Sequence, residues 1–333
     1  MSVPVFVTGG SGFVGGRLIA HLLSKGIPVV ALSRSPASDE VIRAIDPSAA
    51  DSIRLVRGDL HADAAVLAEE MRGVATVYHL AAHADPRANL ADLIKSNVDG
   101  TRNIVAAAKL AGVKRFVHCS TCAVYLRNEH SPVRSAAENS RLDPPTWAGY
   151  AYTKKLADDL VLEANQDGVF ETVSLRPNHV WGIGDTQWLP GLIKAIKENQ
   201  LKRFTPSGYF VSTTNIENLC DAFLLAAKNG RPGHAYNVID SQDIQFEEFV
   251  ERYVQTREPG LKFPSASIPF SFLYTLLWLL DWIPFVKKFL PINRELLCFV
   301  GQEYTINGSK AHNELEYKAS MSREEGLLRM SQQ

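Results

Sequence analysis

Residues 8–15 read Thr8-Gly9-Gly10-Ser11-Gly12-Phe13-Val14-Gly15 and stand between the apolar stretch 3–7 and an amphipathic stretch at 13–24. Gly9 permits a tight turn, Gly12 lets the backbone approach a pyrophosphate, and Gly15 lets a helix pack closely on the preceding strand. The first turn of that helix presents free N–H groups and a positive dipole end to an anion. The motif therefore predicts a dinucleotide-binding strand–loop–helix unit, in which Ser11, Phe13 and Val14 also lie against the cofactor.

Apolar strands and helical stretches alternate outward from this motif. Strands are expected at 3–7, 29–32, 53–56, 74–80 and 114–119, and helices at 13–24, about 39–45, 63–71 and 90–110. A polar loop at 125–146 precedes a helix at 148–165 and a strand at 172–175. This alternation predicts an α/β fold, a doubly wound parallel (Rossmann) sheet with helices on both faces.

The pattern changes after Arg176-Pro177, where helices at 189–198, 216–227 and 246–256 mix with short strands such as 235–239. The later residues are also richer in Phe, Trp and Leu. We expect an NAD(P)-binding Rossmann domain over 1–176 and a smaller, mixed substrate-binding lobe over 177–333. Segments at about 210–240 are expected to return to the first domain.

Composition excludes several classes of protein. The 333 residues are 46% hydrophobic and 21% charged, with a formal net charge of −1, so no strongly basic surface for nucleic acid is indicated. Cys119 and Cys122 form a C-x-x-C pair, but no second ligand pair accompanies them, so free thiols are expected and no metal site. The chain starts almost at once with a strand and shows no basic region before an apolar run, which favours a cytoplasmic protein.

One apolar segment, 268–290, raises the question of a membrane. Its run FSFLYTLLWLL is interrupted on its two sides by Pro269, Asp281, Pro284 and the Lys287-Lys288 pair. The uninterrupted part is well below the ~20 residues that a bilayer span requires. We expect a buried or substrate-facing helix, with contact to a membrane surface as the alternative.

The end of the second strand indicates which cofactor is preferred. NAD sites usually carry an acidic residue there, whereas this chain has Leu32-Ser33-Arg34-Ser35. Arg34 is able to pair with a 2′-phosphate, so NADP (NADPH) is the expected cofactor, with NAD as the alternative. Asp59, followed by Leu60 after the third strand, is placed to accept from the adenine amino group or to cap the next helix.

Three residues carry the expected chemistry. Tyr150 and Lys154 lie four residues apart on a predicted helix and so share one face. A free tyrosine has a pKa near ~10, and a neighbouring ammonium lowers it and makes the hydroxyl a usable proton donor. The same lysine is able to bind the nicotinamide ribose. Thr121, just past the fifth strand, is expected to orient a carbonyl oxygen.

Together these motifs resemble the extended short-chain dehydrogenase/reductases over nearly the whole chain. Besides the glycine loop and the Tyr150/Lys154 pair, the resemblance rests on His79-Leu80-Ala81-Ala82, Asn97-Val98-Asp99-Gly100-Thr101, Ser120-Thr121 with Tyr125, and Leu175-Arg176-Pro177. It implies that Ala81 and Ala82 end a cofactor-side strand, that Asn97 lies near the active site, and that Pro177 begins a nicotinamide-side turn. Most members carry Ser at the position of Thr121, whose hydroxyl is able to do the same work.

Residues 176–185 (RPNHVWGIGD) and 210–218 (FVSTTNIEN) look most like the 3β-hydroxysteroid dehydrogenase branch, which also contains reductases of long-chain 2-alkyl-3-oxoalkanoates. Two departures separate the chain from sugar-nucleotide enzymes of the family. Cys122-Ala123 stands where dehydratases carry Asp-Glu, and His179 stands where epimerases carry Asn. A lipid-like substrate suits the aromatic C-terminal lobe. Its candidate wall residues are Phe270, Phe272, Leu276, Trp278 and Trp282, which alternatively form the core of the lobe.

These inferences predict an NADP(H)-dependent oxidoreductase that interconverts a ketone and a secondary alcohol on a bulky apolar substrate, steroid-like or a long-chain β-keto acid. A hydride passes between C4 of the nicotinamide and the carbonyl carbon while Tyr150 gives its proton to the oxygen. The expected pocket wall comprises His83, Tyr125, Asn178 and Trp181. Two alternatives stay open: a sugar-nucleotide epimerase with tightly held NAD, and an NADP-sensing protein without chemistry. A homodimer through the Tyr150 helix is a further expectation of the resemblance.

Overall fold

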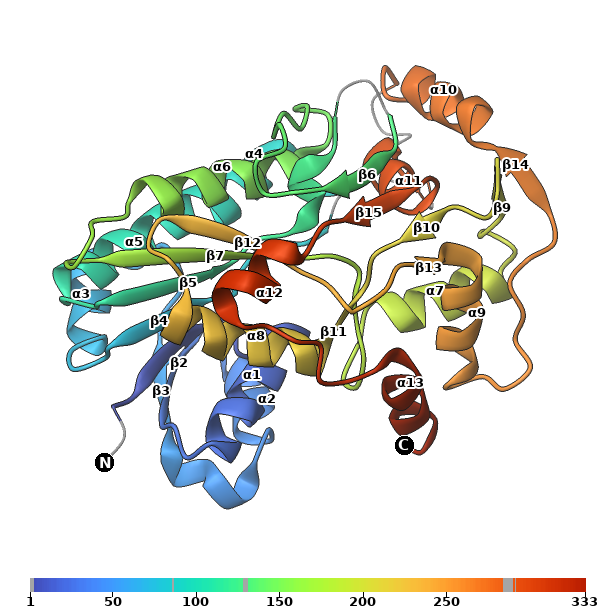
Figure 1. Cartoon of the computed structure of the whole chain (residues 1–333). Coiled ribbons are helices and arrows are strands. Elements are labelled where there is room, and N and C mark those ends of the chain that lie inside the picture. Colours follow the sequence, from blue (N-terminus) through green and yellow to red (C-terminus); the bar gives the residue numbers. More distant parts are fainter. Residues whose placement is uncertain (1–2, 86, 128–130, 284–289, 291) are drawn as a thin grey trace.

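The first apolar stretch forms an interior strand of a seven-stranded parallel sheet in the computed structural model, which describes residues 3–85, 87–127, 131–283, 290 and 292–333 (Figure 1). Every neighbouring pair in this sheet is parallel. The strands run in the order β12 (His234–Val238), β7 (Glu171–Pro177), β5 (Arg115–Cys119), β4 (Thr76–His79), β1 (Val5–Thr8), β2 (Val29–Ser33) and β3 (Ile53–Arg57). The predicted doubly wound α/β fold is confirmed, since the strand order reverses direction at β1 and β4.

Both faces of the sheet are buried, because alternate residues of each strand point to opposite faces. Phe6 packs into an apolar cluster with α3 (Ala64–Glu70), α5 (Gly100–Leu110) and α6 (Gly149–Glu163). Val5 and Val7 pack on the other side. That face is covered by α1 (Phe13–Ser24), α8 (Ile216–Asn229) and α12 (Ser309–Leu315), and α2 (Pro36–Arg43) lies beside β2 (Figure 1).

The helix expected at 90–110 is divided in three. α4 (Leu90–Leu93) passes into a π-helical stretch at Ile94–Asp99 and then into α5. The wider turn places Asn97 inward, where it is almost completely buried. π-Helical turns of this kind occur mostly at functional sites, and this one lies against α6.

The remaining segments build a smaller lobe around a mixed sheet. Its strands run in the order β13 (Ile244–Gln245), β10 (Phe210–Val211), β15 (Tyr304–Ile306) and β6 (Val133–Ala136). Two short pairs join β8 (Val180–Trp181) to β11 (Thr214–Asn215), and β9 (Arg203–Thr205) to β14 (Ser267–Pro269). Helices α7 (Trp188–Lys197), α9 (Phe246–Gln255), α11 (Arg294–Val300) and α13 (Arg323–Ser331) complete it, with 3-10 turns at Pro47–Ser52 and Cys122–Tyr125 elsewhere in the chain.

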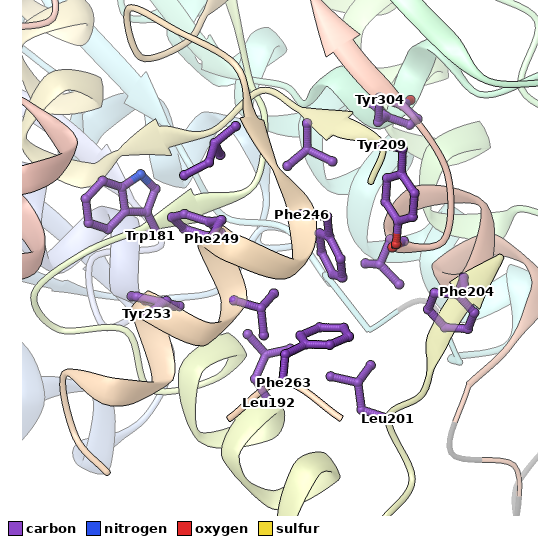
Figure 2. Close-up of a cluster of buried hydrophobic side chains, with 14 of the residues drawn as sticks. Trp181, Leu192, Leu201, Phe204, Tyr209, Phe246, Phe249, Tyr253, Phe263 and Tyr304 are labelled. Carbon is purple, nitrogen blue, oxygen red and sulfur yellow. The ribbon is translucent and has the colours of Figure 1, made fainter. Parts of the chain in front are cut away.

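Aromatic side chains fill the core of this lobe (Figure 2). Trp181, Phe249 and Tyr253 contact one another edge to face or stacked, and Tyr209 stacks on Phe246. All five are buried. The core therefore holds α9 against β8 and β10.

The apolar segment at 268–290 differs from its prediction. It forms a short helix, α10 (Phe270–Leu280), at the edge of the lobe (Figure 1). Leu277 is its buried residue, and several of its large apolar side chains are exposed. Phe272 is 61% exposed and Trp282, just after the helix, 77%. The expectation of a buried or substrate-facing helix is wrong, because this helix rests on α11 by one side alone. Pro284, Lys287 and Lys288 lie outside the described residues, and no described helix is long and apolar enough to cross a membrane.

Candidate active site

The glycine loop leaves an open anion-binding helix end. Gly9 has a φ of +75°, and a Cβ atom there would lie 2.7 Å from the Ala81 nitrogen, so only glycine fits without strain. A Cβ on Gly15 would lie 2.1 Å from the Gly9 oxygen. Helix α1 begins after Gly12 with no side-chain cap, so its first N–H groups remain available to a phosphate.

Two cavities meet at this loop, at the carboxyl ends of the strands where such sheets bind ligands. The reaction cavity, of about 410 Å³, extends toward the small lobe and is lined by Tyr150, Lys154 and Thr121. The nucleotide cavity, of about 460 Å³, extends toward β2 and is lined by Arg34, Asp59 and Leu60. Gly9, Gly12, Leu80 and Ala82 line both, so the loop joins the two.

Most of the residues expected at the cofactor lie on these walls. The reaction cavity includes Phe13, Val14, Gly15 and Pro177. The nucleotide cavity includes Ser11, Ala81 and His83, the last of which was expected at the substrate. Asp59 uses one carboxylate oxygen to accept from the His61 backbone N–H at 2.7 Å, and Asp63, not Asp59, caps α3.

Asn97 lies behind this wall and holds two segments together. Its amide oxygen accepts from the His83 N–H at 2.7 Å, and its amide nitrogen donates to the His83 carbonyl and the Thr153 hydroxyl, both at 3.1 Å. Because Thr153 precedes Lys154 on α6, this asparagine fixes the loop after β4 to the catalytic helix. Asn97 itself is not among the residues that line either cavity.

The three expected catalytic residues meet in the reaction cavity. The Thr121 hydroxyl forms a hydrogen bond with Tyr150 and accepts from the Ala123 N–H at 3.1 Å. The Lys154 ammonium, 3% exposed, donates to the Cys119 carbonyl at 2.7 Å. One helical turn separates Tyr150 from Lys154, so α6 presents both to the same cavity.

The electrostatics of the pair differ from expectation. Burial raises the pKa of Tyr150 above its ordinary value of 10, and the Thr121 hydrogen bond opposes that rise. Burial also lowers the pKa of Lys154. Lys154 is not among the groups that shift the Tyr150 pKa, and its ammonium donates to the Cys119 carbonyl.

Three residues expected at the substrate lie in the protein interior and not on the cavity wall. The Tyr125 hydroxyl donates to the Asn237 amide oxygen at 2.7 Å, and Arg176 donates to that hydroxyl at 3.0 Å. The Trp181 indole N–H donates to Asp240 at 2.8 Å. Asn178 donates to the Ser212 carbonyl at 2.8 Å. All are at most 2% exposed, so their polar groups serve the fold.

The aromatic residues of α10 likewise do not line the reaction cavity. Phe270 packs against the lobe, whereas Phe272, Leu276, Trp278 and Trp282 are exposed. The expectation that they form the substrate wall is corrected: Leu296, Phe299 and Val300 of α11 line the cavity instead.

The wall residues that sequence reasoning missed come from α11, from the start of α7 and from the residues between β7 and β8. Leu296, Phe299 and Val300 of α11 line the reaction cavity together with Trp188 and His179. His179 stacks with Trp188 and contacts Phe299, at ring-centroid distances of 5.4 and 4.2 Å. Burial lowers the His179 pKa to about 3, so the imidazole is neutral. These aromatic side chains are therefore uncharged, whereas Glu295 and Asp185 add carboxyl groups to the same cavity wall.

Glu295 is the most unexpected member of the wall. Its carboxylate accepts from the Ala151 N–H at 2.7 Å and from the Tyr150 N–H at 3.2 Å. Helix α6 has no cap of its own, so Glu295 of the small lobe caps this helix. Burial raises the pKa of this carboxyl to about 7, and the two N–H bonds oppose the rise. No motif links positions 145 residues apart, so sequence reasoning had no signal for it.

Cys119, Cys122, Cys220 and Cys298 are free thiols. Within the part of the chain that the structure describes, no group of three or more His, Cys, Asp or Glu side chains is arranged to hold a metal ion. Burial raises the pKa of Cys119 to about 11, so this thiol in the cavity wall is protonated at neutral pH.

Comparison of the sequence with known proteins identifies relatives of this chain. A model of the NAD dependent epimerase/dehydratase family matches residues 5–238. The chain is 34% identical over 329 residues to the 4-hydroxy-2-methyl-3-oxo-4-farnesyl-3,4-dihydroquinoline-1-oxide ketoreductase of Stigmatella aurantiaca, covering 97% of this chain and 94% of that protein. It is 30% identical over 342 residues to the 2-alkyl-3-oxoalkanoate reductase of Stenotrophomonas maltophilia, covering 98% of each.

Among solved structures, the fold is similar to that of a dTDP-glucose 4,6-dehydratase from Streptomyces venezuelae with NAD bound. The TM-score is 0.76, with 22% identity, and the match covers 98% of this chain and 95% of that one. At this identity the likeness shows a shared fold and no more.

Proposed function

This chain belongs to the NAD dependent epimerase/dehydratase family, and we propose that it is an NADP(H)-dependent oxidoreductase that interconverts a ketone and a secondary alcohol on a bulky apolar substrate. One observation carries the proposal: Tyr150, Lys154 and Thr121 line a single cavity that also contains the glycine loop. A proton donor, a cation and a hydroxyl thus lie beside a phosphate-binding helix end. Carbonyl reduction by a nicotinamide is able to use this combination, because a positioned proton donor protonates the oxygen that receives the negative charge.

The described residues fit a dinucleotide. The uncapped start of α1 and the close approach of Gly9 to Ala81 leave backbone N–H groups open for a pyrophosphate. Leu60 and Asp59 would border the adenine, and Lys154 would bind the nicotinamide ribose. The bound nicotinamide supplies or accepts a hydride.

The side chains of the cavity supply the rest. In the reducing direction the Tyr150 hydroxyl donates its proton to the substrate oxygen, and in the oxidising direction it takes the proton back. The Thr121 hydroxyl, already hydrogen-bonded to Tyr150, holds that oxygen in line. Lys154 stabilises the phenolate once it turns from the Cys119 carbonyl toward the tyrosine and the ribose.

Arg34 supports NADP over NAD. It is exposed at the end of β2, lines the nucleotide cavity, and no acidic residue of the described chain pairs with it. The neighbouring Asp39 carboxylate is held by Arg57, so it does not take the place of the acidic residue that NAD sites use. Ser38 lines the same cavity and adds a hydroxyl for a 2′-phosphate.

The wall chemistry supports an apolar substrate of the sterol or long-chain keto type. Opposite the catalytic residues the cavity is bounded by Leu126, Trp188, Leu296, Phe299 and Val300. A nucleotide-sugar would require donors for a diphosphate, which these side chains do not offer. The ketoreductase and the oxoalkanoate reductase named above are relatives over nearly the whole chain.

We also propose that the exposed face of α10 rests on a lipid surface, from which an apolar substrate reaches the cavity. Phe272, Leu276 and Leu279 recur at helical spacing on its outer face, and Trp278 and Trp282 flank them. Tryptophans at the edge of such a face favour the headgroup region of a bilayer. Residues 270–280 contain no charged side chain. Lys287 and Lys288 follow in the sequence, and lysines next to an apolar segment favour binding to anionic lipid headgroups. The opposite side of α10 packs on α11, which lines the cavity.

A substrate panel tests the proposed activity. NADPH and NADH oxidation are followed with a 3-ketosteroid, a neutral long-chain ketone, a long-chain β-keto acid and a UDP-sugar, beside the Tyr150→Phe variant. We expect turnover of an apolar ketone with NADPH, lost in the variant. Interconversion of the UDP-sugar without turnover of any ketone would instead assign an epimerase. Cofactor binding without any turnover would assign a sensor.

A further inference from the structure

We propose that the reaction cavity accepts ketones that carry no ionised group beside the carbonyl, and that the Glu295 carboxylate is what excludes a substrate carboxylate. This inference rests on the proposed ketone chemistry and narrows its substrate class. Of the two classes that the sequence leaves open, it favours the neutral ketone over the β-keto acid.

The position of Glu295 fixes a carboxyl group in the cavity wall at the start of the helix that carries Tyr150. The side chain is 4% exposed and lines the reaction cavity. Its oxygens accept from the backbone N–H groups of Tyr150 and Ala151 at 3.2 and 2.7 Å. These two hydrogen bonds hold the carboxyl group at the end of α6, in the same cavity that Tyr150 lines.

The cavity offers no second cation to balance a substrate carboxylate. Among the described residues that line it, Lys154 is the one lysine or arginine. Its ammonium donates to the Cys119 carbonyl at 2.7 Å and belongs to the catalytic pair. Arg294, the neighbour of Glu295, faces elsewhere: it pairs with Asp281 at 2.5 Å and stacks on the Trp147 ring at 4.2 Å.

Asp185 adds a second acidic side chain to the wall of the reaction cavity. Asp185 accepts from three backbone N–H groups at 2.8–2.9 Å and from the Tyr253 hydroxyl at 2.8 Å. These four hydrogen bonds hold the Asp185 carboxyl group in place at the start of α7. A substrate carboxylate in this cavity would lose its water and meet two carboxylates, an arrangement that proteins avoid. A ketone, ester or amide carries no such penalty.

The decisive measurement uses two substrates that differ by one charge. The first is a long-chain 2-alkyl-3-oxo acid, freshly prepared, and the second is its primary amide, which has the same shape and no charge. The assay is run with NADPH at pH 8, above the Glu295 pKa of about 7. We expect the kcat/KM of the amide to exceed that of the acid by about tenfold or more.

Three variants attribute the discrimination to Glu295. In Glu295→Gln the ratio of kcat/KM for the amide to kcat/KM for the acid should fall toward one, mainly through a lower KM for the acid. Glu295→Asp keeps the carboxyl group and should keep the wild-type preference for the amide. Glu163→Gln removes the same charge from the exposed far end of α6 and should leave the ratio unchanged. The wild-type ratio needs no variant, so a poorly folded Glu295→Gln protein does not block the test.

The outcomes separate this inference from the proposed function. Equal turnover of acid and amide by the wild type would overturn the inference and leave the ketone chemistry intact. A preference that survives in Glu295→Gln would also overturn it, because another group would then be responsible. If neither substrate nor any ketone of the panel reacts while NADPH binds, the proposed function itself fails.

Discussion

The carboxylate of Asp158 on α6 lies 2.6 Å from the terminal guanidinium nitrogen of Arg176 on β7, and both side chains are at most 3% exposed. A second guanidinium N–H donates to the same carboxylate at 2.9 Å, and Ser174 donates to its other oxygen. Arg176 also donates to the Tyr125 hydroxyl. The catalytic helix is thus fixed to the sheet by a charge pair with every partner satisfied.

Removing one partner of that pair should be costly. We expect Asp158→Ala to lower the free energy of unfolding by about 3–5 kcal/mol, because Arg176 would keep a buried charge without a partner. Denaturant unfolding measures the loss. Asp143→Ala, which breaks the exposed pair with Arg141, is the control and should change stability by less than about 1 kcal/mol. Similar losses in both variants would contradict this account.

Tyr150→Phe should remove the proton donor and little else. We expect kcat to fall by about 10²–10⁴-fold, since general acid catalysis contributes that much, while the Kd for NADPH stays within about twofold. Stopped-flow reduction and cofactor fluorescence separate the two quantities. Tyr152→Phe, two residues along α6, provides a matched control. An active Tyr150→Phe enzyme would remove the tyrosine from the mechanism.

Arg34→Ala should change cofactor preference. A charge-assisted hydrogen bond is worth about 1.5–3 kcal/mol, so NADPH affinity should fall by about 10–100-fold with little effect on NADH. Binding titrations with both cofactors measure this. Arg43→Ala, at the exposed end of α2, should have no comparable effect. Equal weakening of NADPH and NADH in Arg34→Ala would show that this residue does not read the 2′-phosphate.

Stability should depend on pH through Glu295. Burial raises the pKa of its carboxyl from 4.5 to about 7, so the folded state binds more protons than the unfolded state between these values. Its contribution to stability is therefore fully present below pH 4.5 and is lost as pH rises through 7. The loss amounts to about 3 kcal/mol, at 1.36 kcal/mol per pKa unit.

Thermal unfolding from pH 5 to 8 tests the sign. Glu295→Gln should gain stability relative to the wild type as pH rises, whereas Glu163→Gln should follow the wild-type curve. A constant offset between Glu295→Gln and the wild type would show that the carboxyl does not titrate in this range.

Lipid binding should depend on the tryptophans of the α10 face. We expect Trp278→Ser with Trp282→Ser to weaken binding to anionic phospholipid vesicles by about tenfold or more, without loss of activity on a dispersed ketone. Vesicle co-sedimentation measures it. Leu110→Ser with Leu328→Ser removes two other exposed apolar side chains and serves as the control. No vesicle binding by the wild type would reject the lipid surface.

Local signals in the sequence predicted the doubly wound parallel sheet, which the structure confirms. The glycine loop, the parallel strands and the Tyr150/Lys154 spacing each lie within a few residues, and each has a backbone requirement that shows directly in the sequence. Gly9 is an example, because its φ of +75° and its contact with Ala81 exclude any side chain. Such constraints can be recognised in the sequence without knowledge of the rest of the fold.

The substrate half was predicted less well because its contacts span long stretches of chain. Glu295 meets Tyr150 across 145 residues, and Trp181 was expected at the substrate but binds Asp240 in the core. Hydrophobicity also misled at α10, where an apolar run indicated burial and the structure exposes it. Apolar character predicts removal from water, and it does not distinguish a protein core from another apolar surface.

The mixed sheet of the small lobe is assembled from four distant segments, with β6 near residue 135 and β15 near residue 305 at one edge and β10 and β13 between residues 210 and 245 at the other. Between them, β12 returns to the large sheet. The small lobe is therefore not one continuous stretch of sequence that could be exchanged as a unit. A chimaera with a relative that has a single crossover would divide both sheets, because the chain passes between them five times: from β5 to β6, β6 to β7, β7 to β10, β10 to β12 and β12 to β13. During synthesis, too, the wall of the cavity is complete only when almost the whole chain has left the ribosome.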